Sequence, residues 1–253
     1  MIVHRIEPTD AIRPFLSDLR LPKGFNGKIN SNRFIEFFHK NGFRDVDAET
    51  CKRFQDVYNT IAGARLSVAL AQKKEFPEIV QPDEWGYNWI RSRYVTDAIL
   101  LYEATFDLLL QIPWIYFQVY KLNDDKLELG KDLDIILRSC RLRKKVIYDK
   151  NGNVCNIKFG LKDKIAPDLY SLINTFHKKD NVIISKLANY IKHKQCISFK
   201  ELKLQNNFVV LGNNYNSVSS LEEYPLDSII AILKKHHMKL VELGENLQKF
   251  FPY

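Results

Sequence analysis

A cation, an amide and an imidazole occur at helical spacing in the stretch VIISKLANYIKHKQ, residues 182–195. Lys186, Asn189, Lys192 and His193 fall on the arc opposite the apolar side chains. Cations and amides can hold a phosphate, and an imidazole can move a proton near neutral pH. One interpretation is a site that cleaves an RNA backbone, with His193 as acid or base, Asn189 orienting it and both lysines neutralising phosphate. The other is the solvated side of an amphipathic helix.

Within this stretch, residues 189–194 read Asn-Tyr-Ile-Lys-His-Lys. They resemble the N-x-x-K-H-R/K signature at the end of a helix in some members of the HEPN superfamily. These are small all-helical domains of bacterial defence and toxin systems and of RNA-processing proteins, and many are dimeric, metal-independent ribonucleases. The resemblance implies that His193 is the catalytic histidine, that Asn189 is the polar residue, and that Lys192 and Lys194 contact phosphate. It also implies a homodimer with the site in a cleft between protomers.

The chain departs from the family pattern at residue 188. The family's usual arginine precedes the polar residue of the signature, and this chain has Ala188 there. Two interpretations follow from the departure. The chain is either a divergent enzyme that recruits another cation or a relative without catalytic activity.

Two carboxylates, Glu103 and Asp107, form the second candidate site. With Thr96 and Gln111 they are spaced seven, four and four residues apart, which places all four on one side of a helix. Paired carboxylates can serve as acid and base, bind a divalent ion or orient a neighbouring cation. A seam that faced the predicted phosphate site would complete it, whereas a buried ion pair or an exposed helix side would carry no chemistry. Because no third ligand accompanies the pair, no metal is expected.

Basic residues are in excess, with 38 Lys and Arg against 30 Asp and Glu and a formal net charge of +8. A dense basic run covers residues 138–145. In that run Arg141 and Arg143 are candidate phosphate contacts, and Tyr148 is available to stack on a base. The favoured partners are RNA or another nucleic acid, with an acidic protein as the alternative. A solvated, charged helix end would explain the run equally well.

These candidates need a helical scaffold. Apolar residues cover most of the circumference of the stretch 91–120, which predicts the central helix of a bundle, kinked or restarted at Pro113. Asn151-Gly152 lies between two partly alternating apolar runs and predicts a small β-hairpin near 146–159. The expected fold is mainly α, a multi-helix bundle in one domain, 1–253, with a minor insertion at 144–160. The other helices are expected over 10–20, 31–40, 47–74, 132–143, 167–178, 181–194 and 225–249.

Several classes are excluded or disfavoured. The four cysteines form no C-x-x-C pair, which argues against zinc and favours a reducing cytoplasm. The first ten residues lack the apolar core of a signal peptide, and charged residues interrupt 91–120 too often for a membrane span. No P-loop, nucleophile-elbow or dinucleotide fingerprint occurs. We therefore expect a cytoplasmic protein without a membrane partner or a cofactor.

The leading hypothesis is a nucleic-acid-processing or nucleic-acid-binding protein. Its most specific form is a metal-independent, HEPN-like endoribonuclease. The alternative belongs to another class: a non-enzymatic helical interaction protein, such as an antitoxin, immunity or regulatory partner, whose basic surface meets an acidic protein.

Overall fold

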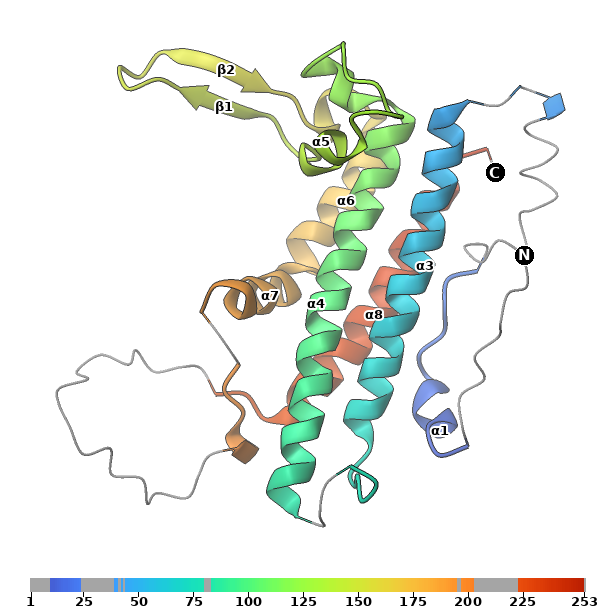
Figure 1. Cartoon of the computed structure of the whole chain (residues 1–253), viewed down its shortest axis with the longest axis vertical. Coiled ribbons are helices and arrows are strands. Elements are labelled where there is room, and N and C mark those ends of the chain that lie inside the picture. The colour runs from blue at the N-terminus through green and yellow to red at the C-terminus, as the bar shows by residue number, and fades with distance from the viewer. Residues whose placement is uncertain are drawn as a thin grey trace. The chain divides into compact units, whose positions relative to one another are not determined.

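The computed structural model of the chain describes residues 10–23, 39–40, 42, 44–79, 83–194, 197–202 and 223–252. Within these residues the chain contains seven α-helices and one two-stranded antiparallel sheet (Figure 1). The prediction of a mainly α protein with a long central helix and a small hairpin is confirmed.

Most predicted helices recur with shifted ends. The helix expected over 31–40 lies largely outside the described residues. The α-helices are α1 (Arg13–Leu16), α3 (Asp45–Gln72), α4 (Glu84–Tyr116), α5 (Leu133–Arg138), α6 (Pro167–Lys179), α7 (Val182–Lys194) and α8 (Leu226–Gln248). The strands are β1 (Lys145–Tyr148) and β2 (Val154–Lys158), and the short 3₁₀ helices are η1 (Val119–Leu122), η2 (Leu161–Asp163) and η3 (Lys200–Leu202).

The central helix α4 begins seven residues earlier than predicted, at Glu84 rather than at residue 91. The cause is Asp83, whose carboxylate accepts hydrogen bonds from the backbone N–H groups of Trp85, at 3.3 Å, and Gly86, at 3.0 Å. Pro113 does not restart the helix, which passes through it. The helix ends three residues later, before Gln118, which adopts a left-handed conformation with φ of 49°.

The chain divides into two compact units. Unit 1 comprises Met1–Arg20, Gly63–Leu101 and Ile183–Met238, and unit 2 comprises Leu21–Ala62, Tyr102–Val182 and Lys239–Tyr253. Each of α3, α4 and α8 contributes residues to both units. That the chain is one domain with an insertion at 144–160 stays a prediction.

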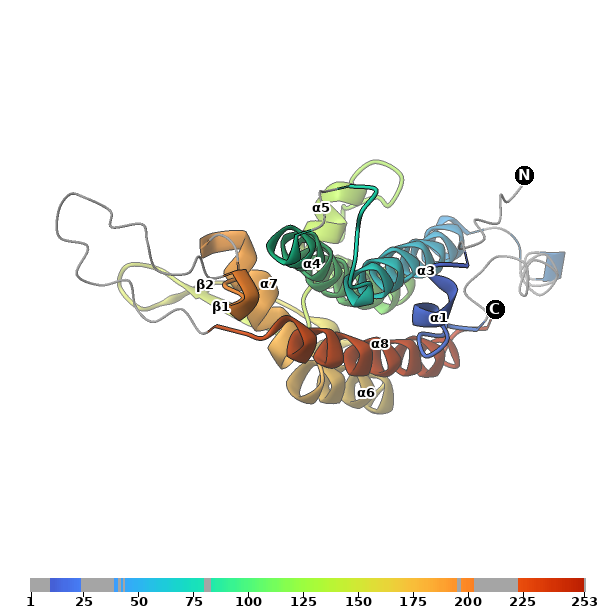
Figure 2. The same cartoon turned by 90° about the horizontal axis from the view of Figure 1, so that it is seen from below.

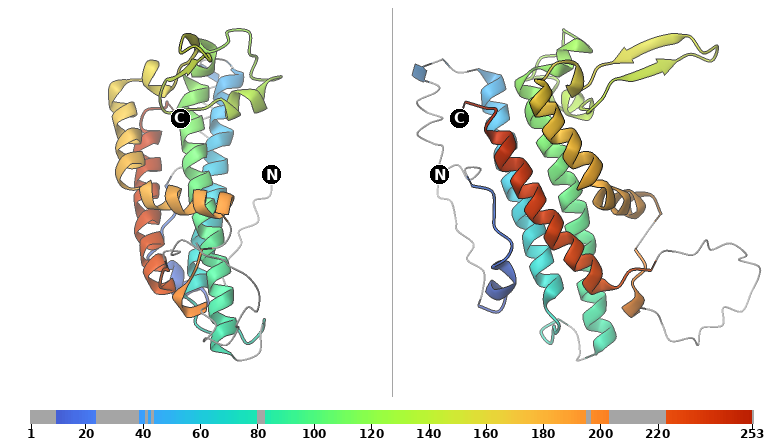
Figure 3. Two further views of the ribbon diagram at one scale, coloured as in Figure 1. Left: turned by 90° about the vertical axis from the view of Figure 1, so that its left-hand side faces the viewer. Right: turned by 180° about the vertical axis from the view of Figure 1, so that it is seen from behind.

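In unit 2 the segments of α3 and α4 form one layer, and α6 and the end of α8 form a second (Figures 2 and 3). Aromatic contacts join the layers: the rings of Phe106 and Phe176 lie 5.4 Å apart, and Phe54 meets Phe251, in the segment that follows α8, edge-on at 5.5 Å. Trp114 is fully buried, and its indole nitrogen donates a hydrogen bond to the carbonyl oxygen of Ile136 at 2.9 Å. This bond ties α5, which precedes the hairpin, to the helical core.

In unit 1, side chains of α3 hold the segment that contains α1. Arg65 donates a hydrogen bond to the carbonyl oxygen of Leu16 at 2.9 Å, and Gln72 donates one to that of Phe15 at 3.3 Å. These bonds satisfy carbonyl groups that a four-residue helix leaves without intrahelical partners.

One histidine of unit 1 is buried and has a perturbed pKa. His237 of α8 is fully buried, and its Nε2 donates a hydrogen bond to the carbonyl oxygen of Arg20 at 2.7 Å. Burial lowers the pKa of this imidazole from 6.5 to about 4, and the positive charges of Arg65 and Arg20 act in the same direction. The hydrogen bond to Arg20 opposes the shift without reversing it.

We expect the free energy of unfolding to fall as the pH falls from about 6.5 towards 4, because only the unfolded chain takes up a proton at His237 in that range. The full effect is about 3 kcal/mol. Thermal unfolding followed by circular dichroism at a series of pH values measures it. His237→Gln keeps an amide donor and does not titrate, so it should flatten this dependence; an unchanged dependence would assign the effect to other groups.

By length and hydropathy alone, α4 is the one helix in the described part of the chain that could cross a membrane. In its most apolar 18-residue window, 56% of the residues are buried inside the protein. The core helix of a soluble bundle meets the same criterion.

Candidate nucleic-acid interface

The hairpin of β1 and β2 extends away from the helices of unit 2 (Figures 1 and 3). Its turn is organised by Asp149, whose carboxylate accepts hydrogen bonds from the backbone N–H groups of Asn151 and Asn153, each at 2.8 Å. These bonds hold the pKa of Asp149 below its ordinary value, and the bond from Asn153 contributes most. Gly152 takes a φ of +81°, which glycine adopts without steric cost. The Asn-Gly signal therefore forms the predicted turn.

The base of the hairpin is clamped to unit 2. Asn123 accepts a hydrogen bond from the N–H of Phe159 at 2.7 Å and donates one to its carbonyl oxygen at 3.2 Å. Gly160 passes so close to Arg143 that a Cβ would lie 2.5 Å from the Arg143 carbonyl carbon. The absence of a side chain at Gly160 permits this close approach, which brings the two ends of the hairpin together where they leave the helical core.

Positive charge is concentrated around this hairpin. Residues 138–164 contain nine Lys and Arg against two Asp, a formal charge of +7, whereas the whole chain carries +8. The other 226 residues together therefore carry only +1. The basic residues of the segment are exposed apart from two, Arg141 and Lys158, which are half-buried. They are Arg138, Arg141, Arg143, Lys144, Lys145, Lys150, Lys158, Lys162 and Lys164.

Like charges face one another within this surface. Lys145 and Lys158 are direct cross-strand partners, an arrangement that destabilises a hairpin. The ammonium group of Lys164 donates a hydrogen bond to the carbonyl oxygen of Gln118 at 3.1 Å. Its pKa is lowered, mainly by burial and secondly by the positive charge of Lys121. A bound polyanion would relieve these repulsions.

The two predicted phosphate contacts of this region lie at the base of the hairpin. Arg141 bonds through Nε to the carbonyl oxygen of Ser139 at 2.9 Å, and Arg143 donates from Nη2 to Asn174 at 2.9 Å. Lys158, Lys162 and Lys164 were not predicted as phosphate contacts, because they follow the turn and lie outside the contiguous basic run. A count of charge over the whole segment 138–164 would have found them.

On α7, the predicted catalytic and phosphate-binding side chains are exposed. Lys186, Asn189, Lys192 and His193 all face solvent, as the arc prediction required. The side chain of Lys194 lies outside the described part of the structure. The helix therefore presents a cation, an amide and an imidazole on its surface.

Ala188, which stands where the HEPN-like signature has arginine, lies on the core-facing side of α7. Ala188 is fully buried, as are Ile184 and Leu187 on the same helix, whereas Ile183 is 52% exposed. An arginine at position 188 would be directed into the core and not towards the exposed arc. The family's usual arginine therefore has no counterpart on this surface at that position.

The predicted carboxylate seam divides between two environments within unit 2. Glu103 is buried and accepts a hydrogen bond from Nδ2 of Asn181, itself fully buried, at 3.1 Å. Asp107, one turn further on, is exposed. Residues 183–194 of α7 belong to unit 1, and the proposed catalytic role of the two carboxylates stays a prediction.

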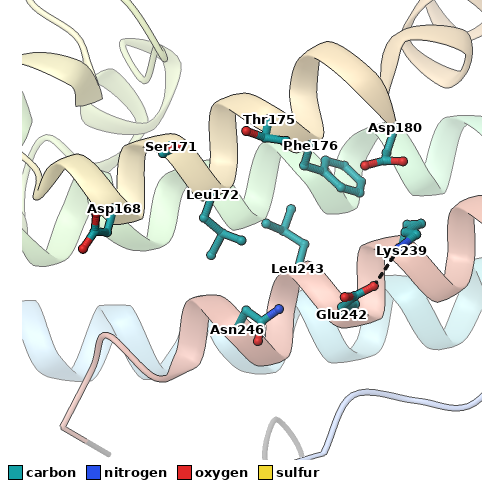
Figure 4. A pocket seen from close by; sticks show the side chains of 10 residues that line it. All are labelled: Asp168, Ser171, Leu172, Thr175, Phe176, Asp180, Lys239, Glu242, Leu243 and Asn246. Carbon is teal, nitrogen blue, oxygen red and sulfur yellow. Dashed lines mark hydrogen bonds and ion pairs between the residues drawn. The ribbon is translucent and has the colours of Figure 1, made fainter.

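A pocket of about 460 Å³ lies between α6 and α8 in unit 2 (Figure 4). Lys239 donates a hydrogen bond to Glu242, one turn further along α8, at 3.0 Å. Three carboxylates stand against one ammonium group, so the pocket repels phosphate and is not part of the basic surface. Its charged and apolar lining residues are Asp168, Asp180, Lys239, Glu242, Leu172, Phe176 and Leu243.

Among the residues described, no three His, Cys, Asp or Glu side chains are grouped as metal ligands would be. Comparison of the chain with protein-family models, curated proteins and solved structures found no match.

Proposed function

We propose that the protein binds nucleic acid through its basic hairpin surface, residues 138–164. The observation that carries this proposal is the concentration of charge: this segment holds +7 of a total of +8. The segment extends from the helices of unit 2, so a phosphate backbone can reach it (Figure 1). Lysine and arginine side chains that neutralise phosphates release counterions, and this release drives binding.

The test is the affinity of the protein for a labelled single-stranded RNA of about 20 nucleotides, measured by fluorescence anisotropy over a range of salt concentrations. The logarithm of the association constant should fall steeply and linearly with the logarithm of the salt concentration. Absent binding, or binding that salt does not weaken, would contradict the proposal. That result would favour the alternative function, a helical interaction protein whose basic surface binds an acidic protein.

A second candidate function is metal-independent cleavage of the bound RNA at α7. It is favoured by the joint exposure of Lys186, Asn189 and His193. In this mechanism His193 transfers the proton and Asn189 orients the imidazole of His193. Lys186 and Lys192 neutralise the phosphate. Because Ala188 is buried, further positive charge must come from another residue, and the partner protomer of a homodimer is the proposed source.

For this candidate we expect cleavage of single-stranded RNA in the presence of EDTA and its loss in His193→Ala. Loss of cleavage with unchanged RNA affinity would assign His193 to chemistry, because an exposed side chain on α7 can be removed without damage to the fold. His177, exposed on α6, provides the control: His177→Ala should cleave like the wild type. A wild-type protein that binds RNA and leaves it intact would reject cleavage and keep binding.

A further inference from the structure

One face of the hairpin is apolar and exposed. Val146 pairs across the strands with Ile157, and Tyr148 pairs with Val154, so these four side chains share a face. Tyr148 is 60% exposed, Val154 54% and Ile157 37%. The opposite face carries the lysines of β1 and β2 and is polar in part. The hairpin thus combines an exposed apolar face with the surrounding positive charge of segment 138–164.

An irregularity in the pairing produces this face. Between Ile147 and Tyr148 the register shifts, so Tyr148 faces Val154 and Cys155 is the extra residue of β2. Such a bulge re-aims the side chains that follow it. Here it brings Val154 opposite the tyrosine ring and extends the apolar face to the end of the strands.

We infer that this face binds the unpaired bases of single-stranded nucleic acid, with Tyr148 as the stacking residue. The inference rests on the proposed nucleic-acid binding and specifies its substrate class. Aromatic side chains within a positive groove or surface hold single strands by stacking on bases while cations contact the backbone. The exposed ring of Tyr148 provides the stacking surface, and Lys145 and Lys150 flank it in sequence.

Charge and shape favour single strands over the other occupants of an apolar face. In a duplex the faces of the bases are already stacked, and only their polar edges are offered in the grooves. A second copy of the chain would bring two segments of charge +7 together. Unpaired bases have apolar faces and are attached to a negatively charged backbone. The bases therefore match the apolar face of the hairpin, and the phosphates match the basic residues around it.

The experiment compares wild type, Tyr148→Ala and Tyr148→Phe in binding to single-stranded RNA and to an RNA duplex of equal length. We expect the wild type to prefer the single strand, and Tyr148→Ala to lose about 10-fold in affinity for it with little change for the duplex. Tyr148→Phe keeps the aromatic ring and should bind like the wild type. Circular dichroism establishes that each variant is folded.

Equal affinity of wild type and Tyr148→Ala for single strands, or an equal loss on both RNAs, would overturn the inference. So would sedimentation that shows a wild-type dimer dissociated by Tyr148→Ala, because the face would then bind a second copy. A variant with Lys144, Lys145, Lys150 and Lys162 replaced by glutamine separates the stacking role of Tyr148 from the proposed nucleic-acid binding. If its RNA binding is lost while Tyr148→Ala binds normally, the stacking role fails and the proposed function stands; if it binds RNA normally, both fail.

Discussion

Replacing the four exposed lysines Lys144, Lys145, Lys150 and Lys162 with glutamine should weaken binding of single-stranded RNA about 100-fold at roughly 0.1 M salt. Each phosphate neutralised on a single strand contributes about 0.7 to the slope of log affinity against log salt. Loss of four contacts should therefore lower that slope by between 2 and 3, in the same titration series.

The matched control removes the same charge from elsewhere. Lys52, Lys178, Lys235 and Lys249 are also exposed and lie outside the basic segment. Their joint replacement with glutamine changes the net charge by the same amount, so it reports the effect of overall charge alone. Similar losses in the two variants would mean that RNA responds to net charge and not to the hairpin.

The second large effect concerns stability. Arg91 is a buried cation, with a side chain only 5% exposed, in unit 1. Its Nε donates to the carbonyl oxygen of Ala71 at 2.9 Å, its Nη1 to Asn88 at 3.0 Å, and its Nη2 to the carboxylate of Asp227. Hydrogen bonds from Lys74 and Arg91 together hold the pKa of Asp227 below its ordinary value. One guanidinium thus joins α3, α4 and the first turn of α8.

We expect Arg91→Met to lower the free energy of unfolding by about 3 kcal/mol, because two buried acceptors lose their donor and the three elements lose their common link. For a chain of this size the midpoint of thermal unfolding should fall by roughly 6–12 °C. Differential scanning calorimetry measures both quantities.

Lys74→Met is the control for this prediction. Lys74 contacts the same carboxylate of Asp227 at 3.0 Å, but both side chains are 66% exposed. Water screens such a pair, so the expected loss is below about 0.5 kcal/mol. A loss as large as that of Arg91→Met would refute the assignment of the stability to the buried guanidinium.

The features that could be predicted from the sequence depend on neighbouring residues. The Asn151-Gly152 turn formed because Asp149 and a glycine with positive φ act within five residues of each other. The exposed arc of Lys186, Asn189 and His193 followed from helical periodicity alone. Both signals were therefore sufficient to place their side chains on a turn or on one side of a helix.

The missed features depend on contacts between distant residues or on competing local signals. Asp83 caps α4, and this earlier start of the helix was not predicted because two prolines precede Asp83 in the sequence. The clamp between Asn123 and Phe159 joins residues 36 positions apart, and no periodicity indicates it. Ala188 is one turn from both Ile184 and Ile191, so periodicity places it on the apolar side of α7, but its complete burial depends on packing against other elements.

The candidate site was predictable in part for the same reason. Arg141 and Arg143 were identified because they belong to a contiguous run, whereas Lys158 was missed because pairing with Lys145 across the hairpin brings it to the same surface. The pattern of apolar residues on the face of Tyr148 depends on the bulge, and the register of a hairpin with an irregular strand is not readable from alternation.

Hydrogen exchange measured by mass spectrometry, with and without a saturating single-stranded RNA, tests the central claim most directly. Bound RNA should slow exchange in peptides that cover residues 144–160, since the hairpin is the surface in contact with it. Protection confined to other segments, such as α7, or no protection at all in 144–160, would contradict the assignment of this hairpin as the nucleic-acid interface.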